Sequence, residues 1–191
     1  YLFAKRVVDV ALSLILLVLT LPLWAFAAVG ILIFDGPGVF FVQTRVGQNG
    51  QRFNLLKFRT LRPIRPVNIP TENLEQRKFA FGTLLRKMRI DEFPQLLQVI
   101  FGQMALVGPR PEMVYYHERS VAQIPFYECR LHTKPGVTGW AQVRFPHTTA
   151  EDEYLMKTAY DLWYVVNRSF FLDLRIVLRT FGVLLQRFGS K

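Results

Sequence analysis

The longest apolar stretch of the chain lies between Asp9 and Asp35 and contains no charged residue. About 25 residues in a straight helix reach about 37 Å, which is more than the thickness of the hydrocarbon core of a bilayer. The stretch is too long for the core of a signal peptide, and no small-residue cleavage site follows it. It therefore predicts a helix that enters a membrane.

Pro22 lies at the centre of this apolar stretch. Because proline lacks a backbone N–H and clashes with the carbonyl four residues back, it kinks or breaks a helix. Basic residues flank the stretch on both sides, with Lys5 and Arg6 before it and Arg45, Arg52, Lys57 and Arg59 after it. Positive charge marks the cytoplasmic side of a membrane segment. A re-entrant helix that is broken at Pro22 is therefore favoured over a kinked spanning helix, and both alternatives stay open.

From residue 37 on, the chain shows the patterns of short strands and amphipathic helices. Residues 39–43 and 52–60 predict the strands of a β-hairpin, closed by the Gly- and Asn-containing turn at 47–51. Helical patterns cover residues 73–88, 91–101 and 112–131, the last with an interruption near Pro125, and two stretches after residue 150. Residues 61–72 predict an irregular loop, and residues 134–143 predict a turn followed by a short strand. The expected fold is α+β and mostly helical, with a membrane-inserted segment at 1–36 and a cytoplasmic-face domain at 37–191.

Two of the helical stretches carry cations beside apolar positions. A basic amphipathic helix next to a membrane segment suits the lipid interface, and residues 73–88 have this pattern, with packing on the core as the alternative. The C-terminal stretches place an apolar set beside arginines: Leu172, Ile176, Leu178, Val183, Trp163 and Phe170 beside Arg168, Arg175 and Arg179. We expect amphipathic interfacial helices in both places.

Asp91 and Glu92 are adjacent carboxylates at the start of a predicted helix. Pro94 suits the first turn of a helix, where unpaired N–H groups favour negative charge. Three cations lie within the five residues before Asp91: Arg86, Lys87 and Arg89. Nearby positive charge holds a carboxylate ionised, so we expect Asp91 to be an anion at neutral pH. Helix capping is the structural alternative to a carboxylate that attacks phosphorus or holds a divalent cation.

Three further features suit a phosphate-rich ligand. Lys57 and Arg59 alternate with apolar residues in the second hairpin strand, so both cations are expected on one face. Prolines on both sides of Arg110 restrict its backbone, and a rigidly held guanidinium suits bidentate phosphate recognition. Gly136 and Gly139 permit a close approach of the backbone to a ligand.

The charge balance of the 191-residue chain indicates an anionic partner. Lys and Arg number 24 against 14 Asp and Glu, which gives a net charge of +10. Phosphate and acidic lipid headgroups fit this balance. Nucleic acid fits poorly, because most aromatic residues lie in apolar runs and not between cations. Cys129 is the one cysteine, which excludes an internal disulfide and a cysteine-rich metal site.

Seven motifs follow one another along almost the whole chain. They are KRVVD at 5–9, Pro22 in the apolar stretch, KFRT at 57–60, RxxxxDE at 86–92, VGPRPE at 107–112, KPGVTGWAQV at 134–143 and the helices from YD at 160–161 to DL at 173–174. In this order they resemble the bacterial sugar transferase family, the monotopic polyprenol-phosphate phosphoglycosyl transferases that start exopolysaccharide and glycoconjugate assembly. The resemblance runs from Lys5 to about Arg179.

The resemblance implies a phosphoglycosyl transferase at the cytoplasmic face of the bacterial inner membrane. Asp91 would attack the β-phosphorus of a UDP-sugar, release UMP and form a covalent phosphosugar, which undecaprenyl phosphate would then attack. Mg²⁺ would be held by Asp91 and Glu92, and Glu92 is alternatively a base toward the lipid phosphate. The residues implied to bind phosphate or nucleotide sugar are Lys57, Arg59, Arg86, Arg110 and Arg144. Those implied to mark the re-entrant membrane segment are Lys5, Arg6, Asp9 and Pro22.

The chain departs from the family pattern at three places. Residues 102–105 read GQMA where members commonly have GDMS, so Gln103 stands in place of an acid. After the WAQV run, this chain has RFPH where many members have NGR, which leaves the sugar or nucleotide contacts around Arg144 open. Leu21 precedes Pro22 where some members carry a serine.

Two other functions stay open beside the transferase. One is a non-catalytic membrane-anchored polyanion-binding protein, which leaves the Asp–Glu pair unexplained. The other is a phosphohydrolase with an aspartyl-phosphate intermediate, in which water replaces the lipid. The expected partners are a UDP-sugar, undecaprenyl phosphate and membrane lipid, without nucleic acid, and a homodimer stays open. The exopolysaccharide-type resemblance suggests galactose or glucose as the sugar.

Overall fold

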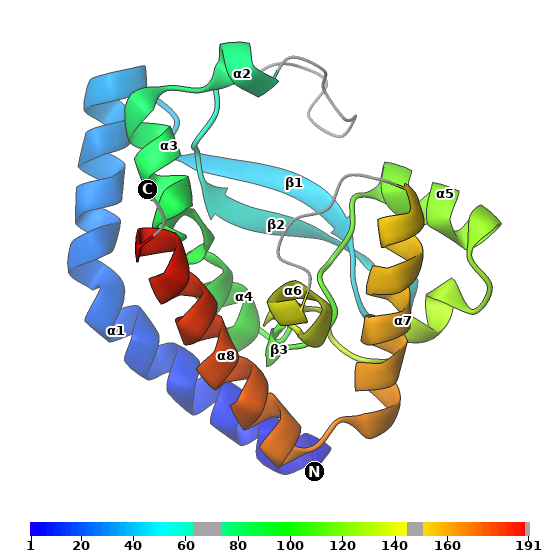
Figure 1. The fold of residues 1–191 in the computed structure, drawn as a ribbon. Helices are drawn as coiled ribbons and strands as arrows, with labels where there is room; N and C mark the ends of the chain where they lie inside the picture. Colours follow the sequence, from blue (N-terminus) through cyan, green and yellow to red (C-terminus); the bar gives the residue numbers. More distant parts are fainter. Residues whose placement is uncertain (63–73, 145–150, 190–191) are drawn as a thin grey trace.

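The computed structural model describes residues 1–62, 74–144 and 151–189. Its elements, in order, are α1 (Leu2–Asp35), β1 (Phe40–Val46), η1 (Gln48–Gly50), β2 (Arg52–Phe58), α2 (Leu74–Arg77), α3 (Ala80–Lys87), η2 (Ile90–Glu92), α4 (Gln95–Ile100), β3 (Ala105–Val107), α5 (Val114–Gln123), η3 (Tyr127–His132), β4 (Gly136–Thr138), α6 (Trp140–Arg144), α7 (Glu151–Asn167) and α8 (Phe170–Gly189). Helices surround two small sheets (Figure 1), which confirms a mostly helical α+β fold. The irregular loop expected at 61–72 lies almost entirely outside the described residues.

The N-terminal helix α1 runs without interruption through Pro22. Figure 1 shows that α1 changes direction partway along its length. A proline inside a helix produces such a bend, because it removes one hydrogen bond and displaces the carbonyl of the preceding turn. The expected break at Pro22 is thus replaced by a bend within one continuous helix.

Most of the apolar surface of α1 has no partner in the described part of the chain. The buried residues of this helix are Asp9, Ser13, Ala27, Gly30 and Ile31, whereas Ile15, Val18, Leu19 and Ile33 are among its exposed apolar side chains. Among the described helices, α1 alone is long and apolar enough to cross a membrane. Exposed apolar surface of this extent suits lipid and not water, which indicates association with a membrane.

The predicted hairpin is confirmed by β1 and β2. The two strands pair antiparallel, from Phe40 opposite Phe58 to Val46 opposite Arg52, and η1 closes the turn. Asn49 in this turn has a φ of 54°. Asparagine tolerates this left-handed conformation better than most residues, which explains why the turn forms here.

The second sheet is a parallel pair, β3 and β4, whose flanking backbones lie very close together. A Cβ added at Gly136 would overlap the backbone nitrogen of Gly108, and one added at Gly139 would overlap the carbonyl oxygen of Gly108. The close approach that these glycines permit is therefore to the chain itself and not to a ligand. The strand is also shorter than expected, because α6 takes up residues 140–144.

The helical stretch expected at 73–88 consists of two helices, α2 and α3, with a short gap between them. Phe81 and Leu85 of α3 are buried in one cluster with Ala27 and Ile31 of α1. Phe81 lies directly over Gly30, where any side chain would collide with its ring. The apolar face of α3 therefore packs on the core, which was the alternative to the lipid interface.

The helices α7 and α8 confirm the two helical stretches after residue 150, and α8 divides its apolar residues between two sides. Leu172 and Ile176 are buried with Val107, Trp140 and Tyr164, so they belong to the core and not to an interfacial face. The exposed apolar side chains of this region include Trp163, Phe170, Phe171, Leu174, Leu178 and Phe181. Those from α8 recur at helical spacing and form one apolar stripe. The side chain of Val183 lies outside the described part.

Replacing Gly136 by alanine tests the close packing of the second sheet. The added Cβ would meet backbone atoms of Gly108, which cannot rotate away as a side chain can. We expect the free energy of unfolding to fall by about 3 kcal/mol or more, measured as a lower melting temperature of the detergent-solubilised protein.

Gly182→Ala in α8 is the matched control for this substitution. No described atom lies within 4 Å of the Cβ it adds, and alanine favours a helix interior over glycine by about 1 kcal/mol. Equal melting temperatures for the two variants would contradict the packing described here.

Candidate functional site

The paired carboxylates Asp91 and Glu92 lie on the short 3₁₀ turn η2, between α3 and α4. Arg89 precedes this turn with a left-handed φ of 58°, and Pro94 stands immediately before α4. The single helix expected to start at Asp91 is therefore a 3₁₀ turn followed by a separate helix. Both carboxylates are buried, with Asp91 7% and Glu92 9% exposed, so their charges must be compensated by nearby groups.

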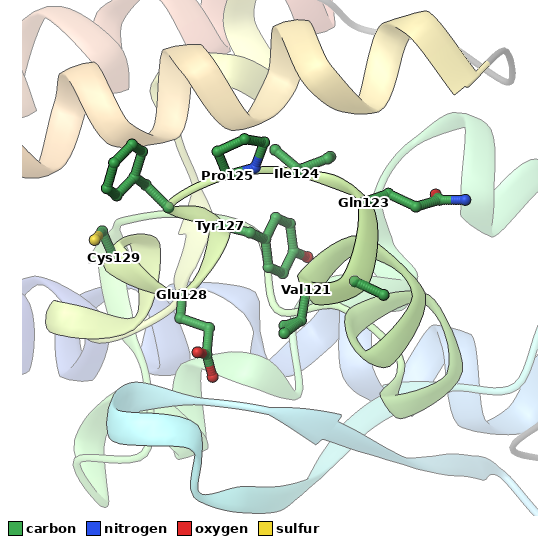
Figure 2. A pocket seen from close by; sticks show the side chains of 9 residues that line it. Val121, Gln123, Ile124, Pro125, Tyr127, Glu128 and Cys129 are labelled. Atoms are coloured by element: carbon green, nitrogen blue, oxygen red, sulfur yellow. The ribbon is translucent and has the colours of Figure 1, made fainter.

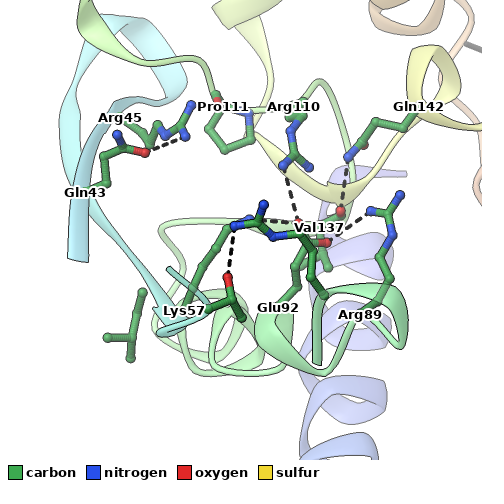
Figure 3. A network of polar contacts seen from close by, with 12 residues as sticks. Gln43, Arg45, Lys57, Arg89, Glu92, Arg110, Pro111, Val137 and Gln142 are labelled. Atoms are coloured by element: carbon green, nitrogen blue, oxygen red, sulfur yellow. Dashed lines mark hydrogen bonds and ion pairs between the residues drawn. The ribbon is translucent and has the colours of Figure 1, made fainter. Parts of the chain in front are cut away.

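Glu92 is held by three cations from three segments of the chain (Figure 3). Its Oε1 accepts hydrogen bonds from Lys57 Nζ at 2.8 Å and Arg110 Nη2 at 3.3 Å, and its Oε2 accepts one from Arg89 Nη1 at 3.3 Å. Burial alone would raise the pKa of Glu92, but the three cations outweigh burial and hold the pKa well below its usual range. These four residues, called the Glu92 cluster below, therefore contain a permanent carboxylate at neutral pH.

Asp91 has different surroundings, although it is the next residue in the chain. Its carboxylate forms no hydrogen bond or ion pair with the described residues, in contrast to Glu92. Burial raises the pKa of Asp91, and the charge of Glu92 adds to the rise, whereas Lys57, Arg86 and Arg110 oppose it. Neighbouring carboxylates whose pKa values are shifted in opposite directions suit different tasks. The cations contact Glu92, and the carboxylate of Asp91 is left without a contact among the described residues.

Arg86 lies beside the carboxylates, but Arg59 does not. Arg86 donates a hydrogen bond to Thr60 Oγ1 at 3.1 Å, and its charge lowers the pKa of Asp91. The guanidinium of Arg59 instead donates to the carbonyls of residues 35–37 at 2.7–2.9 Å, where α1 ends. It also lies 3.3 Å from the carboxylate of Asp35. The structure therefore places Arg59 as a cap on α1, away from Lys57.

Arg144 belongs to a second basic group, formed by α6 and α8. Its guanidinium stacks on Trp140 with 4.5 Å between Cζ and the ring centroid, and Arg179 lies over the same ring at 5.5 Å. The charge of Arg144 lowers the pKa of Arg179, which indicates that the two cations are close. Arg144 makes no contact with the Glu92 cluster in the described structure.

The basic residues before the apolar stretch connect α1 to the helices around the site. Arg6 donates from its two terminal nitrogens to the carbonyls of residues 99–100, at 2.5 and 2.8 Å, where α4 ends. Lys5 forms ion pairs with Asp173 of α8 at 2.9 Å and with Asp9 at 3.4 Å. Carbonyls at a helix end need donors from elsewhere. Arg6 therefore fixes α1 against α4 and Lys5 fixes it against α8, while Asp9 pairs with Lys5 within α1.

Sequence reasoning missed the part that three charged residues play near the site. Arg45 and Arg130 donate hydrogen bonds to carbonyls of the loop that carries Arg110, and Asp161 forms an ion pair with Arg130. The sequence marks Arg45 only as a cation after the apolar stretch and Asp161 only as part of the YD motif, and neither signal indicates a contact with this loop. Arg130 and Asp161 are buried, and charged residues are rarely buried without a specific partner. Their burial would have singled them out, but it is known only from the structure.

A pocket lies apart from the Glu92 cluster, on α5 and η3 (Figure 2). It is lined by residues 121–129, and Glu128 is the one charged side chain among them. The pocket shares no residue with the Glu92 cluster. Because an acidic lining repels phosphate groups, the Glu92 cluster together with Asp91 is the better candidate site for an anionic ligand.

A family model described as bacterial sugar transferase matches residues 1–187. The chain is 41% identical over 186 residues to a UDP-glucose:undecaprenyl-phosphate glucose-1-phosphate transferase of Caulobacter vibrioides, covering 95% of this chain and 69% of that protein. It is 39% identical over 180 residues to the uncharacterized sugar transferase EpsL of Bacillus subtilis, with 92% and 84% covered. It is 35% identical over 203 residues to a UDP-N-acetylgalactosamine-undecaprenyl-phosphate N-acetylgalactosaminephosphotransferase of Aeromonas hydrophila, and spans all of this chain but only 46% of that protein.

Replacing Glu92 by glutamine should destabilise the protein. The substitution leaves Lys57, whose side chain is only 15% exposed, without its counter-charge. Removing one partner of a buried ion pair leaves a buried charge unpaired, so we expect the free energy of unfolding at about pH 7 to fall by about 3 kcal/mol. Denaturant unfolding of the wild type and the variant measures the difference.

The same pair of proteins gives a pH dependence with a defined sign. Folding lowers the pKa of Glu92, so its contribution to stability is fully present above the usual glutamate pKa of about 4.3 and is lost progressively below it. The difference in the free energy of unfolding between the wild type and Glu92→Gln should therefore be smaller at about pH 3 than at about pH 7. Glu118→Gln, which removes the partner of the exposed Arg52, is the control, with an expected change below about 0.5 kcal/mol. A difference that stayed constant with pH would contradict the electrostatic origin.

Proposed function

Because the chain belongs to the bacterial sugar transferase family, we propose that it moves a sugar-1-phosphate from a UDP-sugar to undecaprenyl phosphate. This transfer would be the first membrane step of exopolysaccharide or glycoconjugate synthesis. The names of the Caulobacter and Aeromonas relatives describe such transfers, of glucose-1-phosphate and of an N-acetylgalactosamine phosphate. The cations around Asp91 and Glu92 support the proposal, since they suit the diphosphate of a nucleotide sugar.

The contrast between the two carboxylates is the observation that carries the proposed mechanism. Both oxygens of Glu92 accept hydrogen bonds from cations, so this carboxylate is already occupied. The carboxylate of Asp91 is buried next to the same cations and has no partner among the described residues. A carboxylate in this position suits nucleophilic attack on a phosphorus atom whose charge the cations neutralise.

The proposed reaction has two displacements at one phosphorus atom. A carboxylate oxygen of Asp91 attacks the β-phosphorus, the bond from that phosphorus to the bridging oxygen breaks, and UMP leaves with the bridging oxygen. An oxygen of undecaprenyl phosphate then attacks the same phosphorus, and the bond to Asp91 breaks. The products are undecaprenyl-diphosphate-sugar and the free carboxylate. Covalent catalysis divides a transfer between a soluble donor and a lipid acceptor into two steps at one site.

The cations have separate parts in this proposal. Lys57 and Arg110 contact Glu92 and also act on the charge of Asp91, so they are close enough to neutralise the phosphate under attack. Arg86 acts on Asp91 from α3, through the same electrostatic effect. Arg110 is the most accessible of those that contact Glu92, with 40% of its side chain exposed, which suits contact with an arriving nucleotide.

Mg²⁺ fits the proposed site better at Asp91 than at Glu92. This ion takes carboxylate and phosphate oxygens and commonly uses only one or two protein carboxylates. The two oxygens of Glu92 face three cations, which disfavours a further positive ion there. Asp91 would therefore hold the ion, and when bound the ion would polarise the phosphoryl oxygens.

The membrane placement in this proposal follows from α1 and α8. We place α1 as a re-entrant helix that enters and leaves the bacterial inner membrane on the cytoplasmic face, with its bend at depth. The exposed apolar side chains of α1 and the basic residues at both of its ends support this placement. The apolar stripe of α8, beside Arg175 and Arg179, suits the headgroup region of the same leaflet.

Release of UMP from a panel of UDP-sugars tests the proposed function. The detergent-solubilised protein is assayed with Mg²⁺, with and without undecaprenyl phosphate. We expect UMP release that continues only when the lipid is present, and a loss of at least about a thousandfold in Asp91→Asn, because the nucleophile is removed. Glu118→Gln, an exposed acid away from the site, should keep the activity of the wild type.

The other outcomes of this assay point to the alternative functions. Sustained UMP release without lipid would favour a phosphohydrolase, in which water completes the reaction. No UMP release from any donor by folded protein would remove the catalytic assignment and favour a membrane-anchored polyanion-binding protein. Full activity in Asp91→Asn would overturn only the role of Asp91 as the nucleophile and would leave the proposed transfer in place.

The acid limb of the pH profile provides a separate test of Asp91. Attack requires the carboxylate form, so the rate of UMP release falls when Asp91 is protonated. Burial raises the pKa of Asp91 and bound Mg²⁺ would lower it, so the acid limbs of two proteins are compared at the same Mg²⁺ concentration. Arg86→Gln removes a charge that lowers this pKa, so the limb should move to higher pH. A limb at the same pH in both proteins would contradict the placement of Arg86 beside Asp91.

A further inference from the structure

The carbonyl groups of the loop that carries Arg110 are all hydrogen-bonded to other segments. From residue 109 to residue 112 the bonds are Gly136 N to Pro109 O at 2.9 Å, Arg130 Nη2 to Arg110 O at 2.8 Å, Arg45 Nη1 to Pro111 O at 3.3 Å and Val46 N to Glu112 O at 3.0 Å. Buried backbone carbonyls are normally hydrogen-bonded. Here the four donors come from other segments of the chain, so the loop is fixed at each of four successive carbonyls.

Arg130 brings to this loop a guanidinium that is buried together with its counter-charge. Arg130 is 4% exposed, and its partner Asp161 of α7 is 3% exposed. Asp161 Oδ2 accepts hydrogen bonds from Arg130 Nη2 at 2.6 Å and from Arg130 Nε at 3.1 Å. A buried ion pair has a large desolvation penalty and is weak evidence of stabilisation. Its contact with the carbonyl of Arg110 provides a different reason for its presence.

The orientation of that carbonyl affects where the side chain of Arg110 points. Pro109 and Pro111 fix their own φ angles, and the residue before a proline is restricted to extended conformations. Within that range, the hydrogen bond from Arg130 selects one orientation of the peptide between Arg110 and Pro111. The guanidinium of Arg110 then reaches Glu92 at 3.3 Å, next to Asp91.

We propose that Arg130 and Asp161 are positioning residues that orient Arg110 toward the diphosphate of the nucleotide sugar. Arg130 holds the backbone of Arg110 through its carbonyl. Asp161 neutralises Arg130, because an uncompensated cation at this place would repel the guanidinium of Arg110. The inference rests on the proposed function, in which Arg110 meets the donor phosphates. According to this inference, α7 and η3, which carry Asp161 and Arg130, orient the side chain of Arg110, which lies in a different segment.

The test removes the pair without leaving an unpaired charge. In the variant Arg130→Met/Asp161→Leu, apolar side chains replace both partners, a change that buried ion pairs commonly tolerate without loss of stability. We expect a melting temperature close to that of the wild type, while the KM for the UDP-sugar and the Kd for UDP rise about tenfold. A pair with a purely structural role would instead lower the melting temperature or the active fraction, which reduces kcat and leaves KM and Kd unchanged.

Coupling to Arg110 is the second readout of the same experiment. Arg110→Ala should raise the KM and Kd by itself. Adding the double variant to it should change them by less than about twofold, because the side chain to be oriented is already absent. Asp173→Asn is the matched control, since it removes another buried carboxylate, the partner of Lys5. Whatever change Asp173→Asn causes in the KM and Kd, the change should be the same with and without Arg110→Ala.

The outcomes separate this inference from the proposed function. If the double variant keeps the KM and Kd of the wild type, or if its effect multiplies with that of Arg110→Ala, the positioning role is overturned and the proposed function stands. If the wild type neither releases UMP nor binds UDP, both are overturned. If the double variant does not fold, Arg130→Lys, which keeps the charge beside Asp161, takes its place. Its KM and Kd are compared with those of the wild type, and its effect is measured again in combination with Arg110→Ala.

Discussion

A single buried carboxylate joins three segments whose charges would otherwise repel one another. Lys57 comes from β2, Arg89 from the turn before η2, and Arg110 from the loop after β3, and all three contact Glu92. Three cations against one carboxylate leave an excess of two positive charges. The hairpin, the central helices and the proline-flanked loop are thus held together by an interaction that also leaves the region attractive to phosphate.

The local features of this arrangement could be predicted from the sequence, because they depend on neighbouring residues. The turn at 47–51 specifies the hairpin, and the prolines around Arg110 specify a rigid loop. Pro94 indicates a helix start, although the structure divides that segment into η2 and α4. In each case the conformation follows from the backbone limits of one or two residues.

Contacts between distant segments could not be predicted in this way. The alternation along the strand predicted Arg59 and Lys57 on one face. However, β2 ends at Phe58, and the guanidinium of Arg59 donates hydrogen bonds to the carbonyls at the end of α1. Gly136 was expected to approach a ligand, yet the space beside it is filled by the backbone of Gly108. The sequence shows which groups need partners or permit close contact, and only the tertiary structure shows which neighbour is present.

The contacts of α1 mean that the membrane segment is more than an anchor. Ala27 and Ile31 fill the core against α3, Arg6 holds the carbonyls at the end of α4, and the end of α1 holds Arg59. A shortened polypeptide that began at the hairpin would lose one wall of that core and the cap on α4. A water-soluble form of the protein therefore cannot be made by deleting α1. It would require polar replacements at the exposed apolar side chains of the helix, with its buried side left unchanged.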